Sequence, residues 1–230
     1  MSLPGGWINA VVRVGGTVRR PRHARSSYVH ELLRHLGDWP GAPLFLGVDA
    51  EGREVLSFVD GEAAWRDEAF ARTDANLAEV AALARRMHDL TEGTDLAAGG
   101  SVVCHNDLAP KNTVYRDGSP VAFVDWDLAA PGERVHDLAH ICWQYPDLGR
   151  TTVDVTEAAG MIGVICDGYG FADRGEVVDT VLWWQDRCRR GIETGAAAGD
   201  PAMVGLRDHG VPAAIGAARD WVREHRRRLS

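Results

Sequence analysis

Two short apolar runs, each ending in a group of polar side chains, constrain the fold of this chain more than any other feature. The first run leads into residues 105–112, which begin His-Asn-Asp, and the second leads into residues 125–127, Asp-Trp-Asp. Between the runs lies Asp117-Gly118, and Asp-Gly between apolar segments is a strong signal for a β-hairpin. Such a hairpin would bring Asn112 and Asp125 onto neighbouring strand ends.

The polar residues at these strand ends suit phosphoryl transfer. That reaction requires positioning of the reactants and cations that offset the charge on the phosphate oxygens. Because Mg²⁺ prefers oxygen ligands and keeps several waters, Asn112 and Asp125 are predicted metal ligands, with nucleotide phosphates completing the shell. Asp107 is the predicted catalytic base, which would take the proton of an acceptor hydroxyl. His105 is interpreted as structural support for the turn.

The order and spacing of four short motifs resemble the aminoglycoside phosphotransferase family of the protein-kinase-like superfamily, which also includes choline and homoserine kinases. The Trp within Asp-Trp-Asp matches this branch better than protein kinases, which carry Asp-Phe-Gly there. The strong similarity covers about residues 101–140, and a weaker similarity extends over much of the chain. The motifs are His105-x-Asp107-x-x-x-x-Asn112, Val124-Asp125-Trp126-Asp127, Pro131-Gly132 and His136-Asp137-Leu138-Ala139.

The resemblance implies an α+β, bilobal kinase-like fold with a small β-rich N-terminal lobe and a mostly helical C-terminal lobe. Residues 1–61 would form the reduced nucleotide-binding lobe and linker, and residues 62–230 the catalytic and substrate lobe. It implies ATP and Mg²⁺ as cofactors, with adenine bound by the linker backbone at Phe58 and Val59. It also implies that Asp137 supports the catalytic loop.

Hydrophobic periodicity and turn residues give the expected elements. The N-terminal part is predicted to hold a hairpin with a Gly-Gly turn, one helix and two further strands. The rest, apart from the catalytic hairpin, is predicted to be mostly helical, with a loop at residues 195–200. The predicted strands are 9–14, 17–20, 44–48 and 54–59, and the predicted helices are 28–36, 74–90, 134–145, 154–168, 176–193 and 212–228.

The N-terminal part departs from the family pattern. Gly5-Gly6-Trp7 is at most a remnant of a phosphate-covering loop, and the strand position that normally carries a nucleotide-binding Lys reads Thr-Val-Arg-Arg. Arg19 or Arg20 is therefore expected to contact the nucleotide phosphates, although Arg and Lys differ in shape and are not freely exchanged. Pairing of either arginine with Glu31 would favour an intact ATP site; without it, phosphate positioning would be weaker.

Composition and net charge limit the kinds of ligand that this chain is expected to bind. The chain has 230 residues and a formal net charge of −8, which disfavours nucleic acid as a ligand and suits a cationic small-molecule acceptor. No run approaches the ~18 apolar residues of a membrane span, and the start of the chain lacks a signal-peptide pattern, so a cytoplasmic protein is expected. Predicted acceptor-binding residues are Asp127, Glu133 and Trp184, with packing in the core as the alternative for one of the adjacent tryptophans.

Three functions fit these observations. The favoured one is an ATP-dependent kinase of a small molecule, with an aminoglycoside-like or amino-alcohol acceptor. The second is a non-catalytic nucleotide-binding pseudokinase or scaffold, which the short N-terminal lobe and the missing Lys support. The third is a kinase of a cellular metabolite such as choline or homoserine. The acceptor hydroxyl, the choice between ATP and GTP, and the oligomeric state remain open at this point.

Overall fold

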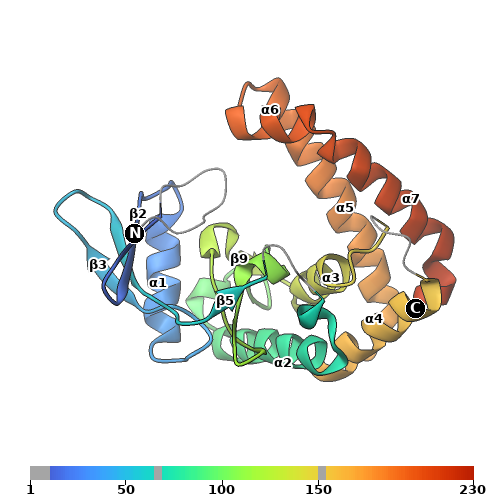
Figure 1. The fold of residues 1–230 in the computed structure, drawn as a ribbon, viewed down its shortest axis with the longest axis horizontal. Helices are drawn as coiled ribbons and strands as arrows, with labels where there is room; N and C mark the ends of the chain where they lie inside the picture. The colour runs from blue at the N-terminus through green and yellow to red at the C-terminus, as the bar shows by residue number, and fades with distance from the viewer. Residues whose placement is uncertain (1–10, 65–68, 150–153) are drawn as a thin grey trace. The chain divides into compact units, whose positions relative to one another are not determined.

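The computed structural model describes residues 11–64, 69–149 and 154–230 (Figure 1). The described residues form two compact units. The first lies within residues 1–68 and 85–133, and the second within residues 69–84 and 134–230. The first unit mixes strands and helix, and the second is helical, which confirms the predicted α+β class. The predicted division into lobes at residue 61 stays a prediction.

An antiparallel sheet of four strands in the order β1-β2-β4-β3 opens the first unit. The predicted Gly-Gly hairpin joins β1 to β2, while residues 9–10 and the Gly5-Gly6-Trp7 segment lie outside the described residues. Helix α1 turns a buried apolar stripe inward, Val29, Leu32, Leu33 and Leu36, as its spacing predicts. The elements are β1 (Val12–Val14), β2 (Thr17–Arg20), α1 (Ser26–Leu36), β3 (Phe45–Val48) and β4 (Glu54–Ser57).

The predicted catalytic hairpin is also present in the first unit. Strand β7 pairs with β8, and its turn has left-handed φ angles of 52° at Asp117 and 80° at Gly118, the conformation that Asp-Gly favours. The backbone N–H of Val124 donates to the carbonyl of Asn112 at 2.9 Å, so the two ends of the hairpin lie side by side. The strands are β5 (Glu62–Ala63), β6 (Val102–Cys104), β7 (Thr113–Arg116), β8 (Ser119–Phe123) and β9 (Ala130–Gly132).

The second unit is built from helices, and α5 and α7 lie side by side along much of their length (Figure 1). Helix α2 (Asp74–Thr91), predicted at 74–90, contributes residues to both units. Within the described residues, no helix is long and apolar enough to cross a membrane. The other helices are α3 (Arg134–Gln144), α4 (Val155–Tyr169), α5 (Arg174–Ala197), α6 (Pro201–Asp208) and α7 (Val211–Leu229).

The expected loop at residues 195–200 was right for residues 198–200 and wrong for residues 195–197. Helix α5 continues to Ala197, because its small alanines are strong helix formers, and only three residues separate it from the unpredicted helix α6. Asp200 begins α6 by accepting a hydrogen bond from the backbone N–H of Ala202 at 2.9 Å, and Pro201 occupies the first helical position. Asp followed by Pro is a helix start signal. The small residues at 195–199 drew the prediction toward a loop instead.

Candidate functional site

The loop at residues 105–112, predicted to be catalytic, holds the carboxylate of Asp107 by one of its two oxygens. The side-chain amide of Asn112 donates to the Asp107 backbone carbonyl at 2.9 Å and to Oδ2 at 2.7 Å. The ammonium of Lys111 lies 3.3 Å from the same Oδ2. Within the described part of the chain Oδ1 accepts no hydrogen bond, and the side chain is 25 % exposed. Asp107 is thus a fixed carboxylate with one oxygen available to a ligand.

His105 ties this loop to the second strand of the hairpin. Its side chain is fully buried, and its ring packs against Trp126 with the ring centres 4.7 Å apart. Nδ1 accepts from the backbone N–H of Asp107 at 3.3 Å, and Nε2 lies 3.1 Å from the carbonyl of Val124. A carbonyl can only accept, so Nε2 is the donor in this contact, and the ring bridges both segments.

The Asp-Trp-Asp segment places two carboxylates on either side of a buried anchor. Trp126 is 1 % exposed, and its indole N–H donates to the carbonyl of Phe123 at 3.0 Å. Asp125 has left-handed backbone angles, φ 64° and ψ 62°, which Asp tolerates better than most residues. The side chains of Asp125 and Asp127 are 49 % and 23 % exposed, so both carboxylates reach the surface of the first unit.

Arg20 at the end of β2 joins these carboxylates to the N-terminal sheet. The side chain is buried, and each of its three nitrogens contacts a different carboxylate. Nε donates to Glu54 of β4, Nη1 lies 3.3 Å from Asp125, and Nη2 lies 2.5 Å from Asp127. Arg20 and Glu54 are direct partners in the strand register. Glu54 also accepts from Nε2 of His30 on α1 at 2.6 Å.

These contacts distinguish the two candidate arginines. Arg20 points toward the carboxylates, whereas Arg19, its neighbour on the alternating strand, lies 3.5 Å from Asp49. Neither arginine pairs with Glu31, which is exposed on α1. Sequence reasoning missed Glu54, although its position two residues before the buried Leu56 in a short strand was a signal for an inward-facing charge.

The charges of the cluster perturb two of its members. Burial opposes the charge of Arg20, but the neighbouring carboxylates of Asp127, Glu54 and Asp125 outweigh it and raise the pKa of the guanidinium. Partial burial and the adjacent charge of Asp127 raise the pKa of Asp125, against the pull of Arg20. Three carboxylates face one guanidinium here, and two histidines also contact them, with His23 at 3.0 Å from Asp127 and His30 at 2.6 Å from Glu54.

The donor set of this region fits Mg²⁺. Asp125 offers carboxylate oxygens, and the amide nitrogen of Asn112 is used by Asp107, which leaves the amide oxygen as a ligand. Both are hard oxygen donors of the kind that Mg²⁺ prefers, and the carboxylates of the Arg20 cluster suit a divalent cation.

The residues predicted to bind adenine lie just after the N-terminal sheet. Phe58 donates its backbone N–H to the carbonyl of Gly16 at 2.9 Å, and the guanidinium of Arg13 stacks on its ring at 3.5 Å. Val59 is half-buried. Their contact with a nucleotide stays a prediction.

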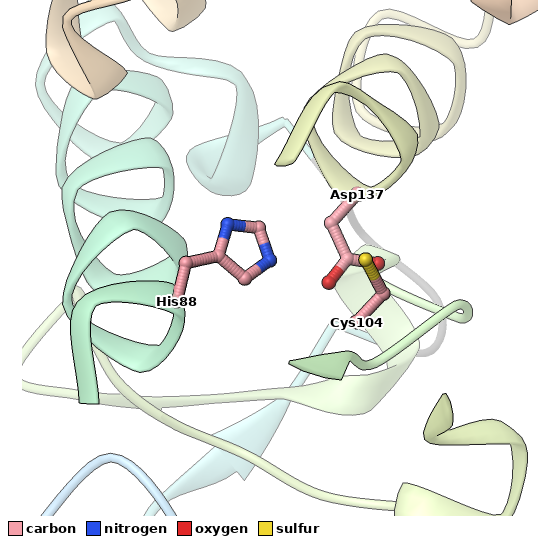
Figure 2. Close-up of side chains that lie close together, drawn as sticks. All are labelled: His88, Cys104 and Asp137. Atoms are coloured by element: carbon pink, nitrogen blue, oxygen red, sulfur yellow. The ribbon is translucent and has the colours of Figure 1, made fainter. Parts of the chain in front are cut away.

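The remaining predicted residues occupy varied surroundings. Asp137 is fully buried in the first turn of α3 in the second unit (Figure 2), and its supporting role stays a prediction. Figure 2 also draws two fully buried side chains of the first unit, His88 from α2 and Cys104 from β6. The thiol of Cys104 donates to the backbone carbonyl of Glu133 at 3.3 Å, and the Glu133 side chain is exposed.

The adjacent tryptophans of α5 differ in exposure. Trp184 is 6 % exposed, and its indole N–H donates to the carbonyl of His136 at 2.7 Å. Trp183 is 44 % exposed, stacks on the His136 ring and borders a shallow hollow of about 420 Å³ along α5. Trp183 is therefore the one that offers an aromatic face to solvent.

Comparison with solved structures defines the class of fold. The chain resembles a choline/ethanolamine kinase family protein from Mesorhizobium loti with a TM-score of 0.64 and 17 % identity, over 97 % of this chain and 92 % of that one. It also resembles the GDP complex of aminoglycoside 2'-phosphotransferase-IIIa, with a TM-score of 0.60 and 13 % identity over 95 % and 91 % of the two chains. The fold is that of these kinase-like phosphotransferases.

Sequence comparison then gives the family. Residues 91–174 match the phosphotransferase enzyme family, a segment that includes Asp107, Asn112 and Asp125. The trifolitoxin immunity protein of Rhizobium leguminosarum bv. trifolii is 34 % identical over 211 residues, with 78 % of each chain covered. The chain belongs to the phosphotransferase enzyme family.

Proposed function

We propose that this protein transfers the γ-phosphoryl group of a Mg²⁺-bound purine nucleotide, ATP in the first instance, to a hydroxyl group of a small molecule. The arrangement of Asp107 carries the proposal. Asn112 and Lys111 hold Oδ2, while Oδ1 is available. A scaffold that only bound a nucleotide would have no need of a carboxylate fixed in this way beside a set of metal-binding oxygens.

The residues divide the chemistry between them. Oδ1 of Asp107 would accept a hydrogen bond from the acceptor hydroxyl and take its proton as the acceptor oxygen bonds to the γ-phosphorus. The bond from the γ-phosphorus to the bridging oxygen breaks, and the nucleoside diphosphate leaves. Asn112 and Asp125 would hold Mg²⁺, which offsets the charge on the phosphate oxygens. Arg20 would hold Asp125 and Asp127 in position.

The acceptor is proposed to be an amino-sugar or an amino-alcohol. The structural relatives include a choline/ethanolamine kinase family protein and an aminoglycoside phosphotransferase, and the acidic composition of this chain suits a cation. The similarity to a trifolitoxin immunity protein favours a second class, in which the acceptor is a toxin and phosphorylation confers immunity. Exposed Glu133 and partly exposed Asp127 are the proposed acceptor-binding carboxylates; Trp184 can contribute only if its buried ring becomes accessible.

The test is transfer of labelled phosphate from γ-labelled ATP or GTP to a panel of acceptors. Kanamycin, choline, ethanolamine and trifolitoxin represent the proposed classes, and mass spectrometry would identify the modified hydroxyl. Mg²⁺-dependent nucleotide binding together with transfer to one class supports the proposal. Binding without transfer to any acceptor, and without stimulated nucleotide hydrolysis, would favour the pseudokinase. Absence of binding at millimolar nucleotide would refute both.

A further inference from the structure

The only lysine of the chain is in the catalytic loop. Lys111 precedes Asn112 in the short helical turn Pro110–Asn112, and its side chain is 45 % exposed. Its ammonium lies 3.3 Å from Oδ2 of Asp107. An exposed ion pair four residues apart contributes little to stability, so stability gives a weak reason for a lysine here.

The strand arginine that could take the nucleotide phosphates is already engaged. Each nitrogen of Arg20 contacts one of three carboxylates, Glu54, Asp125 and Asp127. Arg19 is directed to Asp49 instead. Since all three nitrogens of Arg20 already contact carboxylates, which repel a phosphate, we do not assign this guanidinium to the phosphates.

Lys111 contacts fewer carboxylates than Arg20 does. Its ammonium faces the single carboxylate of Asp107, and its long, flexible stem and partial exposure let the charge reach a neighbouring ligand. The acceptor oxygen is proposed to lie at Oδ1 of Asp107. A phosphoryl group that transfers to the acceptor oxygen passes next to the Asp107 carboxylate. The ammonium of Lys111, held at Oδ2, is within reach of that group.

We infer that Lys111, rather than an arginine of β2, supplies the ammonium that binds the transferring phosphoryl group. The inference rests on the proposed phosphotransferase function and adds a phosphate-binding residue to it. Lys111 would hold the γ-phosphate in the bound nucleotide and offset its charge during transfer. The cation that binds the phosphate would thus lie in the catalytic loop and not in the N-terminal sheet. Arg20 would be the positioning residue for Asp125 and Asp127.

The single lysine makes a direct chemical test possible. An acyl-phosphate derivative of ATP carries its acyl group on the terminal phosphate. A lysine amine near that phosphate attacks the acyl carbon, so that an amide bond forms, the bond from the acyl carbon to the phosphate oxygen breaks, ATP leaves and the amine proton passes to solvent. Because only Lys111 and the chain's N-terminus carry amines, peptide mass spectrometry assigns the site without ambiguity.

We expect Lys111 to be acylated in the presence of Mg²⁺, and excess ATP to suppress the reaction at least tenfold. Acylation of Lys111 that is insensitive to ATP, or its absence while calorimetry shows Mg²⁺-dependent ATP binding, would overturn the inference.

Matched variants test whether the charge contributes to binding. Lys111→Met should weaken Mg·ATP binding by about 10- to 100-fold, the loss of one charged hydrogen bond, and Lys111→Arg should restore most of it. Arg25 is the control cation, because its guanidinium donates to the carbonyl of Ala129 at 2.6 Å. Arg25→Met should bind nucleotide as the wild type does.

The outcomes separate this inference from the proposed function. Equal ATP affinity in Lys111→Met and wild type, with unchanged transfer, would overturn the role of Lys111 and leave the phosphotransferase proposal standing. A wild-type protein that binds no nucleotide would overturn both. Since Lys111 is half-exposed, its variants should fold, and an unchanged thermal midpoint without nucleotide would verify this.

Discussion

Asp107 and Asp125 are both loop aspartates at strand ends, yet their surroundings fit them for different tasks. Asp107 is held through one oxygen by the neutral amide of Asn112 and the ammonium of Lys111, whose charge is opposite to its own. Asp125 adopts a left-handed backbone and stands beside the carboxylate of Asp127, which raises its pKa together with partial burial. The first arrangement suits a base with a fixed orientation, and the second suits a metal ligand.

Replacing Asp107 by Asn should separate binding from transfer. The amide cannot take the acceptor proton, so we expect transfer to fall by roughly 10²- to 10⁴-fold, while the nucleotide Kd changes by less than about threefold. Steady-state transfer and calorimetry would measure the two effects. Asp117→Asn is the matched control, because Asn-Gly fits the exposed β7–β8 turn as well as Asp-Gly. Comparable transfer by Asp107→Asn would remove Asp107 from its role.

Asp125→Asn should stabilise the protein without ligands at neutral pH. The folded structure raises the pKa of Asp125, so this group's contribution to stability is present at low pH and is lost as pH rises through the folded pKa. The amide of the variant does not ionise, so its contribution to stability does not fall as pH rises. It also tolerates the left-handed backbone. We expect a higher thermal midpoint for the variant at pH 7 and a difference that shrinks toward pH 4.

The matching functional measurement is Mg²⁺-dependent nucleotide binding, which Asp125→Asn should weaken at least tenfold. A variant that is less stable than wild type at pH 7 would show that the contact of Asp125 with Arg20 outweighs the repulsion from Asp127. Unchanged nucleotide binding would show that the metal is held elsewhere.

At the scale of elements, β2, β4 and α1 meet through one buried carboxylate. Glu54 is fully buried, directly opposite Arg20 in the strand register, and hydrogen-bonded to His30 of α1. A buried charge is tolerated only when its partners satisfy it, and Glu54 has two. The acid that orients the arginine therefore comes from a strand, where the resemblance to kinases had suggested Glu31 on the helix.

Glu54→Gln should destabilise the first unit. The amide keeps the shape but leaves Arg20 with one fewer carboxylate, so we expect the free energy of unfolding to fall by about 1–3 kcal/mol. Urea denaturation would measure it. Glu51→Gln is the control, because the Glu51 side chain is 70 % exposed and its loss should change stability by less than about 0.5 kcal/mol. Equal stabilities of the two variants would contradict a structural role for Glu54.

On the scale of the whole molecule, the residues proposed to bind Mg²⁺ and phosphate all belong to the first compact unit, and the second unit is helical. A ligand that binds only the folded state raises stability by mass action. At 100 times its Kd, Mg·ATP should stabilise the protein by about 2.7 kcal/mol, which corresponds to roughly 5–10 °C in thermal midpoint for a chain of this size.

Thermal unfolding with ATP, with and without Mg²⁺, would measure this shift. We expect most of the shift to require Mg²⁺ and to be lost in Asp125→Asn. A shift of the same size in the presence of a chelator would show that the nucleotide binds without the metal, and the ligand roles of Asn112 and Asp125 would then be wrong.

The sequence by itself determined most of the local structure, and it supplied the residues that are proposed to form the site. The hairpin that carries Asp107, Asn112 and Asp125 followed from apolar runs around an Asp-Gly turn, and the longer helices followed from their periodicity. These features depend on neighbours a few residues apart, so local patterns are enough to predict them. The family followed from the spacing of short motifs for the same reason.

Tertiary structure alone decided which side chains meet. Arg20 rather than Arg19 reaches the carboxylates, and it pairs with Glu54 at a separation of 34 residues and with Asp125 at 105. The exposure of Trp183 and the burial of Trp184 likewise depend on packing around α5. These contacts depend on burial and charge balance between distant segments, so local sequence patterns do not predict them.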